Sequence, residues 1–335
     1  MTDSRLTFAL DHGLFALPPE GRVAVFRPTA EADLSALPRA RVAAVQGFRP
    51  DHDALAARGY AVTAEPEGSY AAAVVMLPRS REEARALLAE AVARLPEGAP
   101  VVVDGARTDG VDSVLRELRG RVALSEALAK AHGKIAVFPA PGPAALADWR
   151  ARPAEVEGFR TLPGVFSAGG VDRGSALLAA ALPERMPGLV ADLGAGWGYL
   201  AGRILTRPEV RELHLVEAEK AALDCARVNV PDPRARFHWA DATRFAPGIG
   251  FDHVVTNPPF HRGRAGDPGL GAAFIRAAAG LLAGHGQFWM VANRHLPYEA
   301  VLATQFREVE EIGGDAGFKL TRASRPVRAA AGLRR

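Results

Sequence analysis

Short apolar runs recur along the chain and alternate with stretches of helical periodicity. They lie at residues 22–26, 41–45, 71–77 and 101–104 in the first half, and at 189–193, 212–217, 236–240, 251–256 and 288–292 in the second. Apolar runs of this length, separated by helical segments, predict a mostly parallel sheet with helices on both faces. The pattern therefore places the chain in the α/β class.

The two halves of the chain repeat one order of elements. The order is an apolar run, a helical stretch and a second apolar run, at 71–77, 81–95 and 101–104 in the first half and at 252–256, 272–282 and 288–292 in the second. An internal repeat of this kind predicts two tandem domains, which we assign to residues 1–150 and 151–335. A segment rich in proline and glycine, from Phe138 through Pro153 to near Glu157, is the expected linker.

The carboxy-terminal segment has a different pattern. Residues 307–312 and 318–322 are two strand-like runs, and the turn Gly313-Gly-Asp-Ala-Gly317 separates them. Two such runs around a glycine-rich turn predict a hairpin. We expect this hairpin to add antiparallel strands to the otherwise parallel sheet of the second domain.

The sequence Asn257-Pro258-Pro259-Phe260 directly follows the run at 251–256. It therefore stands at the carboxyl end of a buried strand, where open α/β sheets bind their ligands. The side-chain oxygen of Asn257 and the carbonyl of Pro258 can each accept one N–H of a planar amine, and Phe260 offers a flat face to the ring that carries the amine. These four residues indicate transfer of a small group to a planar –NH2.

A glycine-rich turn lies upstream of this motif. Gly194, Gly196 and Gly198 follow Asp192 at the end of the run at 189–193, and a helical stretch begins at residue 199. The spacing differs from that of dinucleotide-binding loops, and the absence of a following Lys-[Ser/Thr] pair excludes a triphosphate P-loop.

Acidic residues stand at the ends of the next two apolar runs. Glu217 comes about 25 residues after Asp192, a spacing at which an acid can bind the hydroxyls of a ribose. Asp241 can accept a hydrogen bond from an adenine amino group or can cap the helix that follows. Glycines alone are a weak signal, but four successive strand ends that carry Asp192 with the glycines, Glu217, Asp241 and Asn257 indicate a nucleoside-containing donor beside an amine acceptor.

This order of motifs resembles class I S-adenosylmethionine-dependent methyltransferases. Further segments are similar to bacterial ribosomal RNA guanine-N2 methyltransferases of the RsmC type, namely 161–167, 170–175, 257–261, 291–298 and 317–319. The resemblance covers most of the chain and is strongest over about 160–322. It implies two tandem Rossmann-like domains. We infer that the amino-terminal copy is degenerate, because Arg27-Pro-Thr29 stands where the glycine turn would be and Leu77-Pro-Arg79 replaces the Asn-Pro-Pro motif.

The resemblance also implies a function and further site residues. The donor is S-adenosylmethionine, with Phe166, Ser167 and Ala242 added to its site, and the acceptor is the N2 amine of a guanine in 16S ribosomal RNA within the small subunit. Three further residues are candidates for contact with the RNA: His261, Arg264 and Lys319. The chain departs from the family at Trp197, which is bulky for a glycine loop.

The composition of the chain bears on where the protein is located and on whether it binds a metal. The chain has 335 residues, of which 48% are hydrophobic, and no apolar run approaches the roughly 20 residues that span a membrane. No secretory signal is visible at the amino terminus. The single cysteine, Cys225, permits no internal disulfide, and the histidines lack the spacing of metal ligands. We expect a cytoplasmic protein without a metal; a monomer is favoured, although the sequence leaves the oligomeric state open.

Three other functions are compatible with the same residues. A large-subunit ribosomal RNA guanine-N2 methyltransferase shares the chemistry and the duplicated architecture. A protein glutamine N5-methyltransferase also uses an Asn-Pro-Pro motif, because a carboxamide nitrogen is another planar amine. A non-catalytic RNA-binding assembly factor belongs to a different class, and the intact glycine turn argues against it.

Overall fold

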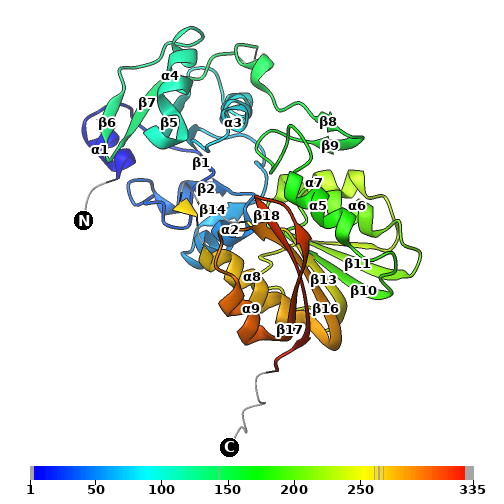
Figure 1. Cartoon of the computed structure of the whole chain (residues 1–335). Helices are drawn as coiled ribbons and strands as arrows, with labels where there is room; N and C mark the ends of the chain where they lie inside the picture. Colours follow the sequence, from blue (N-terminus) through cyan, green and yellow to red (C-terminus); the bar gives the residue numbers. More distant parts are fainter. Residues whose placement is uncertain (1–3, 143, 260, 263–264, 267, 329–335) are drawn as a thin grey trace, which may run out of the picture. The chain divides into compact units, whose positions relative to one another are not determined.

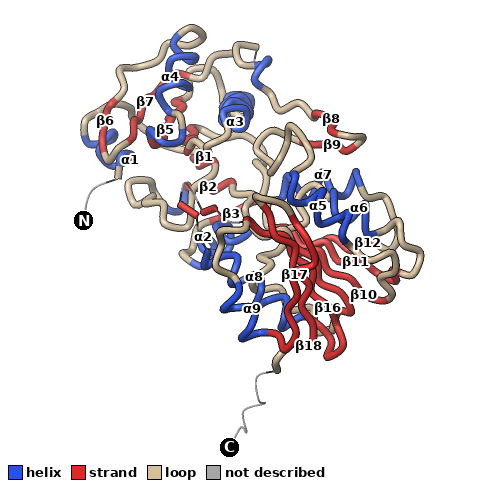
Figure 2. The backbone as a smooth tube through the Cα atoms, viewed as in Figure 1, coloured by secondary structure: helices blue, strands red, loops and turns tan. Residues whose placement is uncertain are grey.

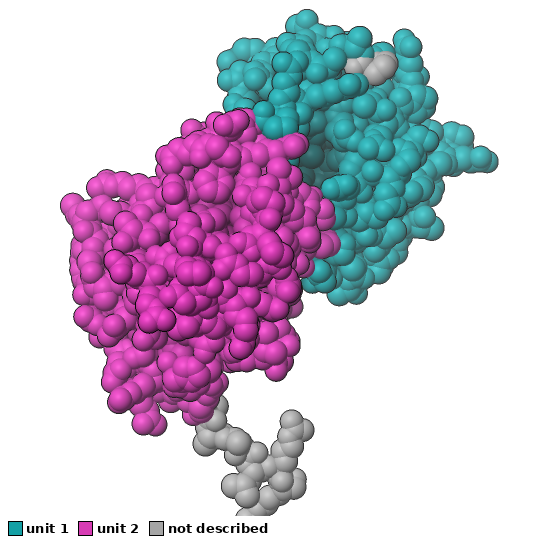
Figure 3. Space-filling view, turned by 90° about the vertical axis from the view of Figure 1, so that its right-hand side faces the viewer, with its two compact units in different colours: residues 1–153, 162–164 teal, residues 154–161, 165–335 magenta. Residues whose placement is uncertain are grey.

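A computed structural model describes residues 4–142, 144–259, 261–262, 265–266 and 268–328 of the chain. The chain divides into two compact units (Figure 3). Unit 1 contains residues 1–153 and 162–164, and unit 2 contains residues 154–161 and 165–335.

Unit 1 contains one sheet and the helices that cover it (Figure 1). Its strands are β1 Val23–Phe26, β2 Val42–Val45, β3 Ala61–Thr63, β4 Ala72–Met76, β5 Pro100–Ala106, β6 Leu128–Lys130 and β7 Gly133–Pro139. Its α-helices are α1 Arg5–Asp11, α2 Arg49–Ala57, α3 Arg81–Ala93 and α4 Val111–Arg119, and short 3₁₀ turns lie at Arg39–Arg41, Arg107–Asp109 and Ala147–Trp149.

Unit 2 contains a second large sheet (Figure 2) and two short strand pairs. The strands of the large sheet are β10 Gly188–Leu193, β11 Val210–Glu217, β12 Ala235–Trp239, β13 Phe251–Thr256, β16 Leu282–Asn293, β17 Phe306–Gly314 and β18 Phe318–Pro326. The short pairs are β8 Ala154–Val156 with β9 Phe159–Thr161, and β14 His261–Arg262 with β15 Ala265–Gly266. The helices are α5 Arg173–Ala181, α6 Tyr199–Ile204, α7 Lys220–Asn229, α8 Pro268–Leu281 and α9 Glu299–Gln305.

The two large sheets have the same topology. Their strand orders are β3-β2-β1-β4-β5-β7-β6 and β12-β11-β10-β13-β16-β18-β17. In each sheet five strands are parallel, and the last two are antiparallel to their neighbours. The prediction of two tandem α/β folds, with the second sheet ending in an antiparallel hairpin, is confirmed.

Alternating side chains of unit 2 serve two cores on opposite faces of its sheet. On β10, Ala191 and Leu193 pack with α8, whereas Val190 packs with α5 and α6. On β16, Phe288 and Trp289 divide between the same two cores. Successive side chains of a strand point to opposite faces, so a continuous apolar run can fill both layers.

The predicted linker is wrong over most of its length. Phe138 belongs to β7, and Leu146 and Trp149 are buried in the apolar core of unit 1. The guanidinium of Arg121 lies 5.0 Å from the centre of the Trp149 ring and pairs with Asp148. Proline and glycine indicated a loop correctly, but the apolar side chains between them attach this loop to the core, because leaving them in water is unfavourable.

In unit 1 a charged side chain stands where the strand order of the sheet reverses. Arg27 follows β1 with a φ of 57°. Its Nε lies 3.2 Å from Oε1 of Glu83, and its Nη1 donates to Oε1 of Gln46. Gln46 is buried, and its Nε2 donates to the carbonyl of Pro28. These contacts occupy the position that the glycine turn has in unit 2.

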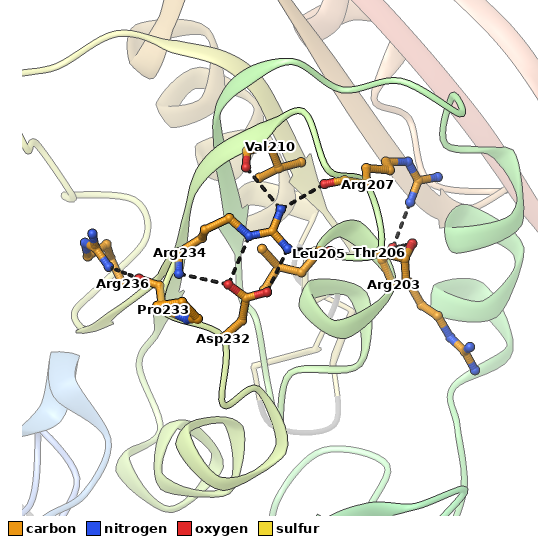
Figure 4. Close-up of polar contacts among 9 residues, drawn as sticks. All are labelled: Arg203, Leu205, Thr206, Arg207, Val210, Asp232, Pro233, Arg234 and Arg236. Atoms are coloured by element: carbon orange, nitrogen blue, oxygen red, sulfur yellow. Dashed lines mark hydrogen bonds and ion pairs between the residues drawn. The ribbon is translucent and has the colours of Figure 1, made fainter.

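One arginine holds together the loops at the amino-terminal edge of the unit 2 sheet (Figure 4). Arg234 donates to the backbone carbonyls of Leu205, Arg207 and Val210. It also pairs with Asp232, whose pKa it lowers. These bonds satisfy carbonyls at the end of α6 and the start of β11, so they fix the connection between the two elements.

Within the ranges described above, no helix is long and apolar enough to cross a membrane.

The packing of Leu146 gives a test of the fold. Leu146→Ala removes a fully buried side chain from the core of unit 1, so we expect it to lower the free energy of unfolding by about 2–5 kcal/mol. The control is Arg150→Ala, at an exposed position four residues later, which should change it by less than about 0.5 kcal/mol. Urea unfolding measures both. Equal effects of the two substitutions would mean that this segment is a linker after all.

Candidate active site

The site lies where the strand order of the unit 2 sheet reverses. β10 and β13 are adjacent and parallel there, and their last residues, Leu193 and Thr256, stand opposite each other. The buried hydroxyl of Thr256 donates to the carbonyl of Leu193 at 2.7 Å. The next residues are Gly194 on one strand and Asn257 on the other, so this register places the glycine turn beside the Asn-Pro-Pro motif.

The glycine turn depends on backbone conformations that other residues rarely adopt. Gly194, Gly196 and Gly198 have φ values of 74°, 55° and 92°. At Gly198 a Cβ atom would also meet the side chain of Val230 at 2.9 Å. Gly198 directly precedes α6. The three glycines therefore let the chain turn from β10 into α6, and they place no side chain over the backbone of the turn.

Two carboxylates lie under and beside the turn. Asp192 is completely buried, and neither of its oxygens has a hydrogen-bond partner. Burial, followed by the nearby charge of Glu217, raises the pKa of Asp192 to about 7. Glu217 accepts from the backbone N–H of Gly196 at 2.8 Å and from that of Glu219 at 2.7 Å. These bonds fix the Glu217 carboxylate against the turn and leave lone pairs on both oxygens.

A cavity opens at the glycine turn. Its walls come from the segment before α5, the first turn of α5, the glycine turn, the start of α6 and the end of β13. They are formed by Phe166, Ser167, Asp172, Ser175, Gly194, Ala195, Gly196, Trp197, Tyr199, Leu200 and Asn257. The structure therefore brings two of the predicted glycines, Phe166 and Ser167 to one cavity with Asn257, whereas Asp192, Glu217 and Asp241 are not among its lining residues.

Asn257 is held in this cavity wall through its amide nitrogen. Nδ2 donates to Oδ2 of Asp172 at 2.8 Å and to Oγ of Ser175 at 2.9 Å. An ionised carboxylate can only accept, so the amide must present its nitrogen to Asp172. Its oxygen, Oδ1, therefore lies on the other side of the amide group from Asp172.

The rest of the predicted acceptor motif is described in part. Pro258 is buried and Pro259 is exposed. His261 belongs to β14. Phe260 and Arg264 lie outside the described residues, as does the side chain of His261.

The glycine turn accommodates the bulky Trp197 because the Trp197 ring packs against other aromatic side chains. Its ring is buried and packs against Phe159 and Tyr199 at centroid distances of 5.3 and 5.8 Å. Its Nε1 donates to the carbonyl of Phe166 at 2.9 Å. This bond attaches Phe166 and Ser167 to the turn, and the Phe166 side chain remains 58% exposed beside the cavity.

Three predicted residues are engaged in contacts within unit 2. Asp241 accepts from the backbone N–H and the hydroxyl of Thr243, so it caps the turn that follows it. Ala242 packs in the core behind β10. Lys319 pairs with Glu299 at the start of α9. These contacts favour the capping role that the sequence left open for Asp241, and they give Lys319 a partner within unit 2.

Ser175 was not predicted as a site residue. Its backbone N–H donates to the Asp172 carboxylate at 2.8 Å, which caps α5. The Asp-x-x-Ser spacing in the sequence is typical of such a helix start. Nothing local relates this pair to Asn257, which follows more than 80 residues later. The contact exists because α5 packs against β16 and β18 of the sheet.

The chain is similar to known proteins over both units. The Methyltransferase small domain family matches residues 157–322. "Ribosomal RNA small subunit methyltransferase C" of Pseudomonas paraeruginosa is 33% identical over 79% of this chain and 82% of its own length. The protein of the same name from Pectobacterium atrosepticum is 32% identical over 77% of this chain and 76% of its own length.

A solved structure agrees with these relatives. The 16S rRNA N2 methyltransferase RsmC of T. thermophilus, in complex with AdoMet and guanosine, has a TM-score of 0.78 to this structure at 25% identity and covers 97% of this chain and 92% of its own. On the strength of the Pseudomonas relative, this chain belongs to the RsmC family of ribosomal RNA small subunit methyltransferases.

Proposed function

We propose that this protein transfers a methyl group from S-adenosylmethionine to the exocyclic N2 amine of a guanine in 16S ribosomal RNA. The observation that carries this proposal is the register of β10 and β13, which places a glycine turn with two acids beside an asparagine whose amide nitrogen is bonded to Asp172. Among the relatives, the T. thermophilus protein has a guanosine complex and acts on N2 in 16S rRNA. These relatives favour the small-subunit target over the large-subunit and protein-glutamine alternatives.

The residues present fit S-adenosylmethionine. When bound, this group supplies a methyl on a cationic sulfur, which makes the methyl electrophilic. Asp192 offers a buried carboxylate without a partner, of opposite charge to such a donor. Glu217 retains lone pairs for two ribose hydroxyls, and Gly194 and Gly196 allow close approach to the backbone. Phe166 and Ser167 would form the outer wall of the same site.

The acceptor side positions a weak nucleophile. The lone pair of a guanine N2 amine is delocalised into the ring, so the amine needs orientation. Oδ1 of Asn257 and the carbonyl of Pro258 would each accept one N–H. These two bonds would turn the lone pair of the N2 nitrogen out of the plane of the base. Positioning of this kind can supply several kcal/mol of the barrier reduction, and no group is needed to remove a proton before attack, because the cationic product is acidic.

Unit 1 has a different role in this proposal. It has the same strand order as unit 2, but Arg27, Glu83 and Gln46 occupy the position of the donor turn. We assign it to recognition of the RNA and to support of the fold. Exposed arginines on α4, Arg116 and Arg119, are candidate contacts for phosphates. A cytoplasmic location follows from the substrate, because small ribosomal subunits are found there.

The proposed function is tested together with the role of Asn257. Small subunits from a strain that lacks the gene are incubated with the protein and S-adenosylmethionine, and their nucleosides are analysed by mass spectrometry. We expect N2-methylguanosine to appear with the native protein. Asn257→Ala should slow its formation by about 10²-fold or more, about 2.7 kcal/mol at the barrier, because the amine loses one acceptor.

Donor binding serves as the control for this substitution. Calorimetry should give near-normal affinity of Asn257→Ala for S-adenosylmethionine, since the glycine turn is intact. The absence of N2-methylguanosine with the native protein would contradict the proposed reaction. Unchanged turnover of Asn257→Ala would contradict only the amine-orienting role.

The buried acid predicts a pH dependence of stability. Folding raises the pKa of Asp192 from an ordinary 3.8 to about 7, so the folded state holds its proton more tightly than the unfolded state does. Stability therefore falls as the pH rises through this range. Each pKa unit corresponds to about 1.4 kcal/mol, so ionising Asp192 costs the fold about 4 kcal/mol, of which about 3 kcal/mol falls between pH 5 and pH 8.

Asp192→Asn removes this titration. The free energies of unfolding of both proteins are measured with urea, without donor. From pH 5 to pH 8 the native protein should lose about 3 kcal/mol of stability relative to the variant. Calorimetry should show weaker donor binding by the same variant. A difference in stability that is independent of pH would mean that Asp192 does not titrate in this range.

The role of unit 1 predicts a salt-dependent loss of RNA affinity. Replacing Arg116 and Arg119 by Glu in the full chain should weaken binding to 16S RNA and lower the slope of log affinity against log salt by about 2, because two phosphate contacts are lost. Donor affinity should not change. The matched control replaces two exposed arginines of unit 2, Arg211 and Arg307, by Glu. An equal loss in both double variants would indicate a general charge effect and contradict a specific role of α4.

A further inference from the structure

The direction of the Asn257 amide decides whether the site can work. With Oδ1 toward the substrate, the amide accepts an N–H of the target amine. Rotated by 180°, it would present Nδ2 instead, and two donors would face each other. An asparagine amide has nearly the same shape in both directions, so packing alone does not select one of them. A selecting group must distinguish a nitrogen from an oxygen.

Two side chains at the start of α5 contact the nitrogen of this amide. Asp172 precedes the helix and Ser175 lies in its first turn. Both accept from Nδ2 of Asn257, at 2.8 and 2.9 Å, so both hydrogens of the amide are engaged. Ser175 is 8% exposed, which keeps competing water from most of its surface.

The two acceptors contribute differently. A serine hydroxyl can accept or donate, so Ser175 alone would tolerate either direction of the amide. An ionised aspartate cannot donate, so Asp172 discriminates between nitrogen and oxygen. Its Oδ2 also accepts from the backbone N–H of Ser175 at 2.8 Å, which caps α5 and restricts the carboxylate to one position.

Local packing adds to this restriction. Gly174 lies between the two residues, and a Cβ atom there would approach Oδ2 of Asp172 to 3.1 Å and a ring carbon of Phe318 to 3.0 Å. The helix start is thus closely packed around the oxygen that accepts from Asn257. A helix cap that needed only to satisfy a backbone N–H would not require a second donor on the same oxygen.

We propose that Asp172 and Ser175 are positioning residues that lock the Asn257 amide with its oxygen toward the target amine. The inference rests on the proposed function, in which Asn257 accepts from that amine. Asp172 sets the direction of the amide, and Ser175 restricts its rotation. Neither residue needs to touch the guanine for this effect.

The proposal is tested with a double-mutant cycle in the full chain. Ser175→Ala removes one acceptor but keeps the backbone N–H that Asp172 caps. It should lower kcat on small subunits by about 5-fold, the value of one net hydrogen bond, with donor affinity within about 2-fold of native. In the Asn257→Ala background the same substitution should lower kcat by less than about 2-fold further, since no amide remains to be oriented.

A matched control separates this effect from helix stability. Thr304 lies in α9 of unit 2, and its hydroxyl donates within that helix to the carbonyl of Val301. Thr304→Ala should leave kcat unchanged. Asp172→Asn keeps a side-chain oxygen that can cap α5, but it loses the charge and the acceptor-only character. We expect a larger loss of kcat for Asp172→Asn than for Ser175→Ala.

Nuclear magnetic resonance gives a readout that does not depend on activity. The side-chain amide resonances of Asn257 are assigned by their loss in Asn257→Ala. Ser175→Ala should shift one of the two amide protons, and Asp172→Asn should shift the other. Unmoved resonances, or an equal loss of kcat from Ser175→Ala in both backgrounds, would overturn the proposal. If the native protein did not methylate the subunits, the proposed function would fail, and the resonances would still decide whether the amide is locked.

Discussion

The site depends on one register between two parallel strands. Leu193 and Thr256 pair at the carboxyl ends of β10 and β13, and the Thr256 hydroxyl bonds to the Leu193 carbonyl. A shift of one residue would turn each side chain to the other face of the sheet. It would also separate the glycine turn from Asn257. The buried apolar faces of both strands fix this register, so the core of unit 2 determines the geometry of the chemistry.

The duplicated topology shows how much of the fold is independent of the reaction. Both sheets have the same strand order and the same antiparallel edge. At the reversal of strand order, unit 2 has glycines and a cavity, whereas unit 1 has Arg27 with its partners Glu83 and Gln46. The strand order is set by apolar packing, which both units retain. The chemistry requires a few residues at strand ends, and these can be replaced without loss of the sheet.

Polar groups around the unit 2 site differ in how far they are satisfied. The amide of Asn257 and the carboxylate of Glu217 have bonds that fix their positions. Asp192 has none, and its burial raises its pKa. A buried carboxylate without a partner destabilises the fold, and this one lies two residues before the glycine turn.

The sequence by itself determined the features that depend on neighbouring residues. Apolar runs, glycines and prolines give strands, turns and helix starts locally, and these signals predicted both sheets, the terminal hairpin and the strand ends that carry Asp192, Glu217 and Asn257. Only the tertiary structure decided how distant segments meet. It attached Leu146 and Trp149 to the core of unit 1, bonded Trp197 to Phe166, and brought Asp172 and Ser175 to Asn257. Those contacts join segments up to 85 residues apart, and they arise from the packing of helices on a sheet, which no local pattern encodes.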